Sequence, residues 1–170
     1  MRKSNLVLTG MPGAGKSTAG VLAAKALGMN FIDTDLLLQQ KAKRLLQEII
    51  GQEGIAAFLA REEETILGLA ADNCVIATGG SVIYSHKSME HLRQKGLVIY
   101  LMLPLAELEV RIKNMSSRGI VMAAGQDLHS LYLERTPLYR ASADLVLDCS
   151  GQEIEETVTA ICTAARGHLR

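Results

Sequence analysis

The sequence lacks an excess of charge of either sign. Lysine and arginine together number 18, aspartate and glutamate also number 18, and the formal net charge is zero. Proteins that bind nucleic acid over a broad surface carry a net basic charge, so we do not expect nucleic acid as a partner. A local basic pocket for phosphate groups remains compatible with this composition.

Cysteine is scarce, and long apolar runs are missing. Cys74, Cys149 and Cys162 are odd in number and show neither CxxC nor metal-ligand spacing, so we expect reduced thiols in a cytoplasmic protein. The longest apolar run, residues 97–105, is too short to span a membrane, and the first predicted strand leaves no room for a cleaved signal peptide. The four histidines lack the spacing of metal ligands.

What the sequence does contain is a complete phosphate-binding pattern near its start. Residues 10–17, GMPGAGKS, match GxxxxGK[ST] in full. An apolar run at 5–9 predicts a strand before them, and an Ala- and Leu-rich run at 18–27 predicts a helix after them. In that context backbone N–H groups surround the phosphates, Lys16 reaches the β- and γ-phosphates, and the hydroxyl of Ser17 takes a magnesium position. The alternative is a turn that only joins strand to helix.

Short apolar strands alternate with helices along the chain, which predicts one α/β domain, residues 1–170, with a parallel sheet covered on both faces. The predicted strands are 5–9, 31–32, 74–77, 97–102 and 145–147. The predicted helices are 18–27, 35–50 with Gly51 as C-cap, 53–71, 105–113, and a last helix to about 165 that opens with a Ser150–Glu153 capping box. Ligands of such sheets bind at the carboxyl ends of the strands.

Polar and glycine residues follow two of these strands. After the second strand, one of Asp33 and Asp35 could orient magnesium while the other accepts a proton from a substrate hydroxyl; the alternative is that Asp33 or Thr34 only caps the next helix. After the third strand, Gly79 and Gly80 let the backbone approach a ligand; the alternative is an ordinary turn with Ser81 as the cap.

Two further stretches leave alternatives open. Residues 114–126 contain two glycines, Arg118 and no regular period, and we favour a flap over the phosphates to an inert surface loop. Arg118 and Arg135 could each offset the charge that develops on a transferred phosphoryl group, although a lone arginine is usually a solvated surface residue. The run 62–64, EEE, is interpreted as a solvated helix face of which one member could point inward.

Together these motifs resemble the shikimate kinases, small P-loop phosphotransferases of the nucleoside-monophosphate-kinase fold. The resemblance extends from Leu6 to about Asp148 and rests on residues 10–18, on FIDTD at 31–35, on ATGG at 77–80, on Arg118 and on RTPLY at 135–139. It implies a three-layer α/β fold with a five-stranded parallel sheet of order 2-3-1-4-5, a lid at about 114–126 and an acceptor-binding helical region at about 34–62. ATP would donate its γ-phosphoryl group to a hydroxyl of a small carboxylic acid, with shikimate the best single expectation.

The resemblance also implies a role for each site residue, with ATP and Mg²⁺ as cofactors, a small-molecule substrate as partner and a monomer in the cytoplasm. The catalytic residues would be Lys16, Asp35 and Arg118. The nucleotide would be bound by Gly13, Ala14, Gly15, Lys16, Ser17, Thr18, Arg111 and Arg118. Magnesium would be ordered by Ser17 and Asp33, and the acceptor would be bound by Asp35, Gly79, Gly80, Ser81 and Arg135, with Arg61 as a further candidate.

The sequence departs from the family pattern on the acceptor and lid side. The family usually has FRxxE, whose Arg grips the acceptor carboxylate, and here residues 58–62 read FLARE, with Leu59 at the Arg position. Arg61 lies about 200° further around the helix and would point away unless the helix is rotated. A carboxylate that faces Leu59 loses a charge-assisted pair of about 1.5–3 kcal/mol, which is a tenfold to hundredfold effect on affinity. Ser81 replaces the third glycine of the family's GGG, and GIV at 119–121 replaces PLL.

Three hypotheses follow from these departures. The first is a shikimate kinase with a rearranged carboxylate grip. The second is a kinase of another small hydroxylated metabolite, such as a sugar acid or a nucleotide. The third is a nucleotide-binding regulatory domain without an acceptor, against which the retained Asp35 and Arg135 argue.

Overall fold

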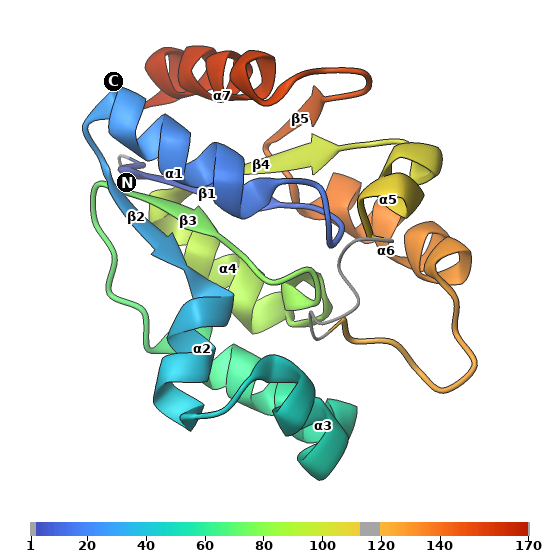
Figure 1. Cartoon of the computed structure of the whole chain (residues 1–170). Coiled ribbons are helices and arrows are strands. Elements are labelled where there is room, and N and C mark those ends of the chain that lie inside the picture. Colours follow the sequence, from blue (N-terminus) through green and yellow to red (C-terminus); the bar gives the residue numbers. More distant parts are fainter. Residues whose placement is uncertain (1–2, 113–119, 170) are drawn as a thin grey trace.

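A five-stranded parallel sheet forms the centre of the computed structural model, which describes residues 3–112 and 120–169 (Figure 1). The strand order is β2-β3-β1-β4-β5, and every neighbouring pair is parallel. The strands are β1 (Asn5–Thr9), β2 (Asn30–Asp33), β3 (Cys74–Ala77), β4 (Gly96–Met102) and β5 (Leu145–Asp148). The predicted fold class and strand order are therefore confirmed.

Helices cover both faces of this sheet (Figure 1). Helices α1 and α7 lie on one face and α4 and α6 on the other, while α2 and α3 extend beyond the carboxyl end of β2. Their bounds are α1 (Lys16–Leu27), α2 (Thr34–Ala42), α3 (Leu46–Leu67), α4 (His86–Lys95), α5 (Leu105–Ile112), α6 (Leu128–Ser142) and α7 (Ile154–His168), with a 3₁₀ helix η1 at Val82–Tyr84. Within the described ranges no helix is long and apolar enough to cross a membrane.

The main core lies between the sheet and its two helical layers. Strands β1 and β3 are buried along their whole length, which explains why they read as continuous apolar runs and not as alternating ones. A second, smaller apolar cluster joins α2, α3 and the segment after residue 119, and it consists of Leu38, Leu46, Ile49, Phe58 and Val121. This second cluster positions the helical region beside the carboxyl ends of the strands.

The prediction of one helix over 35–50 with Gly51 as its C-cap is wrong. Helix α2 ends at Ala42 because Lys43 has a left-handed backbone, with φ of 53°. Helix α3 then begins at Leu46, where the carboxylate of Glu48 accepts a hydrogen bond of 2.8 Å from the N–H of Leu45. It continues through Gly51 and kinks at Gly54, whose φ is 83° and ψ is 171°. Apolar residues occur on both sides of the break, so the hydrophobic periodicity of the sequence does not indicate it.

Two other local predictions differ from the structure. Helix α4 was not predicted, because its charged sequence, HKSMEHLRQK, shows few apolar positions. The capping box of the last helix lies three residues later than expected, since Glu153 is the N-cap and its N–H is bound by the carboxylate of Glu156 at 2.9 Å. The hydroxyl of Ser150 instead donates to Asp148 in the preceding turn.

Alanine substitutions at Gly51 and Gly54 should change stability in opposite directions. A Cβ at either position meets nothing within 4 Å, so only backbone conformation separates them. Gly51→Ala should raise the free energy of unfolding by about 0.5–1 kcal/mol, because alanine is the better helix former. Gly54→Ala should lower it by about 1–3 kcal/mol, because that region of φ and ψ is nearly exclusive to glycine. Urea unfolding of the two variants measures both changes. A Gly51→Ala variant less stable than the wild type would contradict a helical conformation at Gly51 and indicate a left-handed C-cap there.

Candidate active site

The glycine loop closes the carboxyl end of β1 and lines a cavity of about 580 Å³. Gly10 has φ of 146°, and a Cβ there would lie 2.8 Å from the carbonyl oxygen of Leu101, so this position requires glycine. Helix α1 begins at Lys16, directly after the loop. The unpaired N–H groups of its first turn and the partial positive charge of its N-terminus therefore face the cavity, which suits an anion.

Lys16 lies across this loop and is only 8% exposed. Its Nζ donates hydrogen bonds to the carbonyl oxygens of Gly10 at 2.7 Å and Met11 at 2.9 Å. A phosphate in the loop would offer the ammonium group charged acceptors, which form stronger hydrogen bonds than carbonyl oxygens do.

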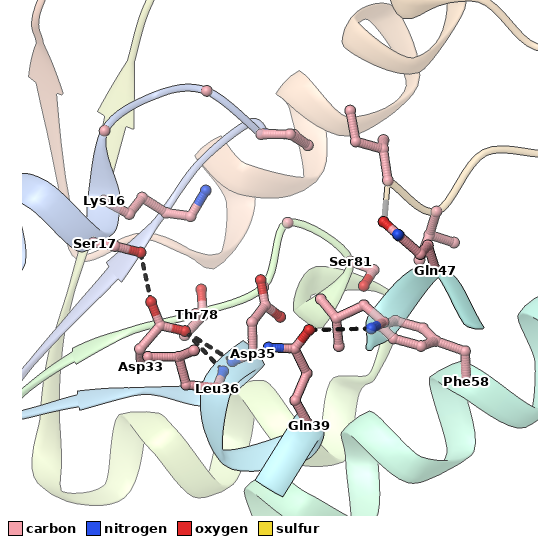
Figure 2. Close-up of a pocket in the computed structure, with 18 of the residues that line it drawn as sticks. Lys16, Ser17, Asp33, Asp35, Leu36, Gln39, Gln47, Phe58, Thr78 and Ser81 are labelled. Carbon is pink, nitrogen blue, oxygen red and sulfur yellow. Dashed lines mark hydrogen bonds between the residues drawn. The ribbon is translucent and has the colours of Figure 1, made fainter. Parts of the chain in front are cut away.

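Asp33 binds both the loop and the helix that follows β2. Its Oδ2 accepts a hydrogen bond of 2.6 Å from the hydroxyl of Ser17, and its Oδ1 accepts from the N–H groups of Asp35 at 3.0 Å and Leu36 at 3.2 Å (Figure 2). The capping interpretation is thus confirmed for Asp33, and the same carboxylate also reaches the glycine loop. Thr34 does not cap the helix; its hydroxyl accepts from the N–H of Gly79 at 3.1 Å.

The Ser17–Asp33 pair fits the ligand preference of magnesium, a hard cation that takes oxygen ligands. No group of three or more His, Cys, Asp or Glu side chains in the described part of the chain could hold a metal ion by itself. Magnesium in phosphate sites commonly takes one or two protein oxygens and completes its shell with phosphate oxygens and water. The donor set at Ser17 and Asp33 matches that arrangement.

The opposite side of the cavity is built by residues from three elements (Figure 2). Lys16, Ser17 and Asp33 lie on one side and Gln47, Phe58 and Ser81 on the other, with Asp35 between them. The predicted residues that line the cavity are Gly13, Gly15, Lys16, Ser17, Thr18, Asp33, Asp35, Gly79, Gly80, Ser81, Arg111 and Arg135. Ala14 is buried beneath the loop and is absent from the lining.

Arg135 is held rigidly on the acceptor side and is 1% exposed. Its Nη2 donates to the carbonyl oxygen of Val121 at 2.7 Å and its Nε to the hydroxyl of Tyr84 at 3.1 Å, with the guanidinium 5.2 Å from the centre of the Tyr84 ring. A Cβ on Gly80 would lie 2.9 Å from Nη1 of Arg135, so glycine lets the backbone come this close. A buried, oriented guanidinium at a cavity wall is suited to a carboxylate.

The arginines near the lid are less fully described. Arg118, and with it residues 113–119 of the expected lid, lies outside the described residues. Arg111 on α5 lies against the glycine loop, with its Nη1 3.5 Å from the carbonyl oxygen of Gly13. Ile120 and Val121, which follow residues 113–119, line the cavity.

The structure does not bring Arg61 to the cavity. Its Nε and Nη2 donate to the carboxylate of Glu53 at 2.8 and 3.2 Å, and Glu53 also binds Arg44. Arg61 therefore points away from the acceptor side, as expected from helical spacing. Leu59 packs against the second apolar cluster and is absent from the cavity lining, whereas its neighbour Phe58 lines the cavity. Among the described residues that line the cavity, Arg135 is the cation on the acceptor side.

Glu62 is a buried side chain whose environment the sequence did not indicate. It is 5% exposed, and its Oε2 accepts a hydrogen bond of 2.8 Å from the hydroxyl of Ser81. Its Oε1 has no hydrogen-bond partner. The pKa of the Glu62 carboxyl is raised to about 7, chiefly by burial and in part by the negative charge of Asp35, against the opposing effects of the Ser81 hydrogen bond and Arg135. Glu62 is thus the member of 62–64 that points inward, which the interpretation of that run allowed, and the Ser81 hydroxyl binds this carboxyl instead of capping a helix.

Comparisons with known proteins agree with this geometry. The sequence model of the family described as shikimate kinase matches residues 12–166. The chain is 37% identical over 166 residues to shikimate kinase 2 of Enterobacter sp. (strain 638), covering 95% of each chain. It is 37% identical over 156 residues to shikimate kinase of Thiobacillus denitrificans, covering 90% of this chain and 85% of the relative. The structure of shikimate kinase from Acinetobacter baumannii in complex with shikimate superposes with a TM-score of 0.89 at 29% identity, covering 97% of this chain and 94% of that one.

Glu62 should make stability depend on pH in a way that its neighbours do not. In the unfolded chain its carboxyl ionises near the ordinary value of 4.5, and in the folded chain near 7. Between these values the folded state holds more protons, so the free energy of unfolding falls as pH rises through 7 and levels off above about pH 8 as far as Glu62 is concerned. The fall should amount to about 3 kcal/mol relative to Glu62→Gln.

Urea unfolding from pH 4 to pH 8 measures this difference. The matched control is Glu64→Gln, because Glu64 lies on the same helix but is exposed, and its pH profile should follow that of the wild type. Parallel profiles for the wild type and Glu62→Gln would mean that Glu62 is ionised in the folded protein at neutral pH.

Proposed function

Because the chain belongs to the shikimate kinase family, we propose that it transfers the γ-phosphoryl group of ATP to a hydroxyl group of shikimate. The observation that carries this proposal is the placement of Asp35 and Arg135 across one cavity from a complete glycine loop. The loop is suited to bind the phosphates of ATP. On the facing side, Asp35 is suited to a substrate hydroxyl and Arg135 to a substrate carboxylate. A domain that only sensed nucleotides would need neither Asp35 nor Arg135 at the cavity wall.

The phosphate side acts by position and charge, as phosphoryl transfer requires. The glycine loop and the first turn of α1 hold the β- and γ-phosphates, and Lys16 offsets their charge. Arg118 adds a second cation from the lid, and Arg111 lies at the outer side of the loop. Ser17 and Asp33 hold Mg²⁺, which neutralises charge on the phosphate oxygens when it is bound.

The acceptor side places the nucleophile. Arg135 binds the acceptor carboxylate, and the Gly79–Ser81 turn gives the acceptor ring room against the backbone. Asp35 accepts a hydrogen bond from the reacting hydroxyl and takes its proton as the oxygen attacks the γ-phosphorus. The bond from that phosphorus to the bridging oxygen breaks, and ADP leaves with the electron pair.

A second acceptor remains a candidate because of one observation: Leu59 stands where the family has a carboxylate-binding arginine, and Arg61 does not replace it. A hydroxylated metabolite that needs only one arginine for its anionic group would fit this cavity equally well. We propose further that the protein acts as a monomer, with neither nucleic acid nor membrane as a partner.

Release of ADP in a coupled assay tests the function directly. With ATP, Mg²⁺ and shikimate, turnover should exceed the ATPase rate without acceptor, and Lys16→Ala should lower it about a hundredfold or more, because it removes a cation that stabilises the transition state. Lys25→Ala is the matched control, since Lys25 is exposed at the far end of the same helix and should leave turnover unchanged. The substrate assignment fails if shikimate gives no turnover above the background rate.

Leu59→Arg should lower the KM for shikimate. An arginine at this position restores a charge-assisted pair of about 1.5–3 kcal/mol, so the expected decrease is tenfold to hundredfold at saturating ATP. Leu59→Met, which keeps the volume but adds no charge, should leave the KM within about twofold of the wild type. An unchanged KM in Leu59→Arg, in a variant that folds normally, would show that the missing arginine does not limit acceptor binding.

A further inference from the structure

Two carboxyl groups from different helices occupy the space beside Gly79 that a side chain would fill. A Cβ built on Gly79 would lie 2.5 Å from Oε1 of Glu62 and 2.7 Å from Oδ1 of Asp35. Asp35 lines the cavity, whereas Glu62 is buried and absent from the lining. A carboxylate at the cavity and a buried carboxyl group therefore lie close together on the same side of the Gly79 backbone, beside the turn that forms the acceptor wall.

The buried carboxyl group has one polar contact and no counter-ion at ion-pair distance. Its Oε2 is bound by the Ser81 hydroxyl, its Oε1 has no partner, and none of the ion pairs between described residues includes it. A carboxylate in such a place would be an uncompensated buried charge, which is strongly unfavourable. Protonation removes that charge while the hydrogen bond from Ser81 stays.

The charges around this carboxyl group bear on acceptor binding. The groups that face Glu62 are Asp35 from α2, Ser81 from the turn and Arg135 from α6. With Glu62 neutral, Arg135 faces one anion, Asp35, and has attraction left for an acceptor carboxylate. With Glu62 ionised, Arg135 faces two anions, and an acceptor carboxylate would be a third negative charge beside a single cation.

We propose that Glu62 is a positioning residue that must carry its proton when an anionic acceptor binds at Arg135, so that acceptor binding and protonation of Glu62 are linked. The proposal rests on the proposed function, since it concerns the acceptor of that same reaction. Glu62 acts through Arg135 and the Gly79–Ser81 turn, and it touches neither the nucleotide side nor the cavity itself. The hydrogen bond from Ser81 keeps the neutral Glu62 side chain oriented. Glu62 has no arginine one helical turn earlier, because Leu59 occupies that position.

The KM for shikimate should then depend on pH through Glu62. In the wild type the KM should be nearly constant below about pH 6, about double that value at about pH 7 and about tenfold higher by about pH 8, because the binding-competent form loses its proton over that range. In Glu62→Gln, which imitates the protonated side chain, the KM should stay at the value that the wild type shows at about pH 6. The kcat profile is recorded in parallel, because a residue that acts only on acceptor binding changes the KM and leaves kcat alone.

Calorimetry gives a second readout that a purely structural role would not move. Shikimate binding near pH 8, measured in buffers of different ionisation enthalpy, should take up about one proton in the wild type and none in Glu62→Gln. Glu64→Gln, with its exposed carboxylate on the same helix, should behave as the wild type in both experiments.

Ser81→Ala keeps the proposal testable if Glu62→Gln folds poorly. Loss of the hydroxyl removes the hydrogen bond that favours the ionised carboxyl, so the pH at which the KM begins to rise should move upward. An unmoved inflection in Ser81→Ala, or a KM in Glu62→Gln that rises with pH as in the wild type, overturns the linkage and leaves the kinase function in place. Absence of shikimate binding and turnover at every pH overturns the function, and the linkage with it.

Discussion

The carboxylate of Asp33 is the connection on which the geometry of the site depends. One oxygen binds the hydroxyl of Ser17 in the glycine loop, and the other holds the first N–H groups of α2. Because Asp33 ends β2 and Ser17 lies in the first turn of α1, this one group fixes the phosphate side relative to the helix that bears Asp35. Catalysis by positioning requires such a fixed relation, since phosphoryl transfer depends on alignment of donor and acceptor.

The phosphate side and the sheet were predictable from sequence because local rules determine them. GMPGAGKS at 10–17 specifies loop, helix start and ligand class together, and buried parallel strands read as apolar runs. The break at Lys43 and the buried state of Glu62 were not predictable, because neither follows from local pattern. Lys43 has a left-handed backbone without being glycine, and Glu62 is buried only because the turn after β3 packs on α3.

Leu59 and Ser81, two departures from the family pattern, are best understood together with Glu62, which retains the family's glutamate. Leu59 leaves Glu62 without a cation one turn away, and Ser81 supplies a hydroxyl at 2.8 Å from the same carboxyl group. A glycine at position 81 would leave both oxygens of a buried carboxyl group unpaired, at a cost of about 1–3 kcal/mol. Sequence comparison alone shows two missing features, whereas the structure shows that the Ser81 hydroxyl binds the buried carboxyl group on the helix that bears Leu59.

The two sides of the cavity differ in how freely evolution can alter them. The phosphate side is made largely of backbone N–H groups whose arrangement depends on glycine conformation, so few substitutions are compatible with it. The acceptor side is made of side chains from α2, α3, α6 and the turn after β3, and a change in one can be offset by a change in another. If Glu62 must be neutral for the acceptor to bind, acceptor affinity depends on the balance of charge around Arg135 as well as on the number of arginines there. On that proposal, a neutral neighbouring carboxyl group offsets part of the loss of one cation.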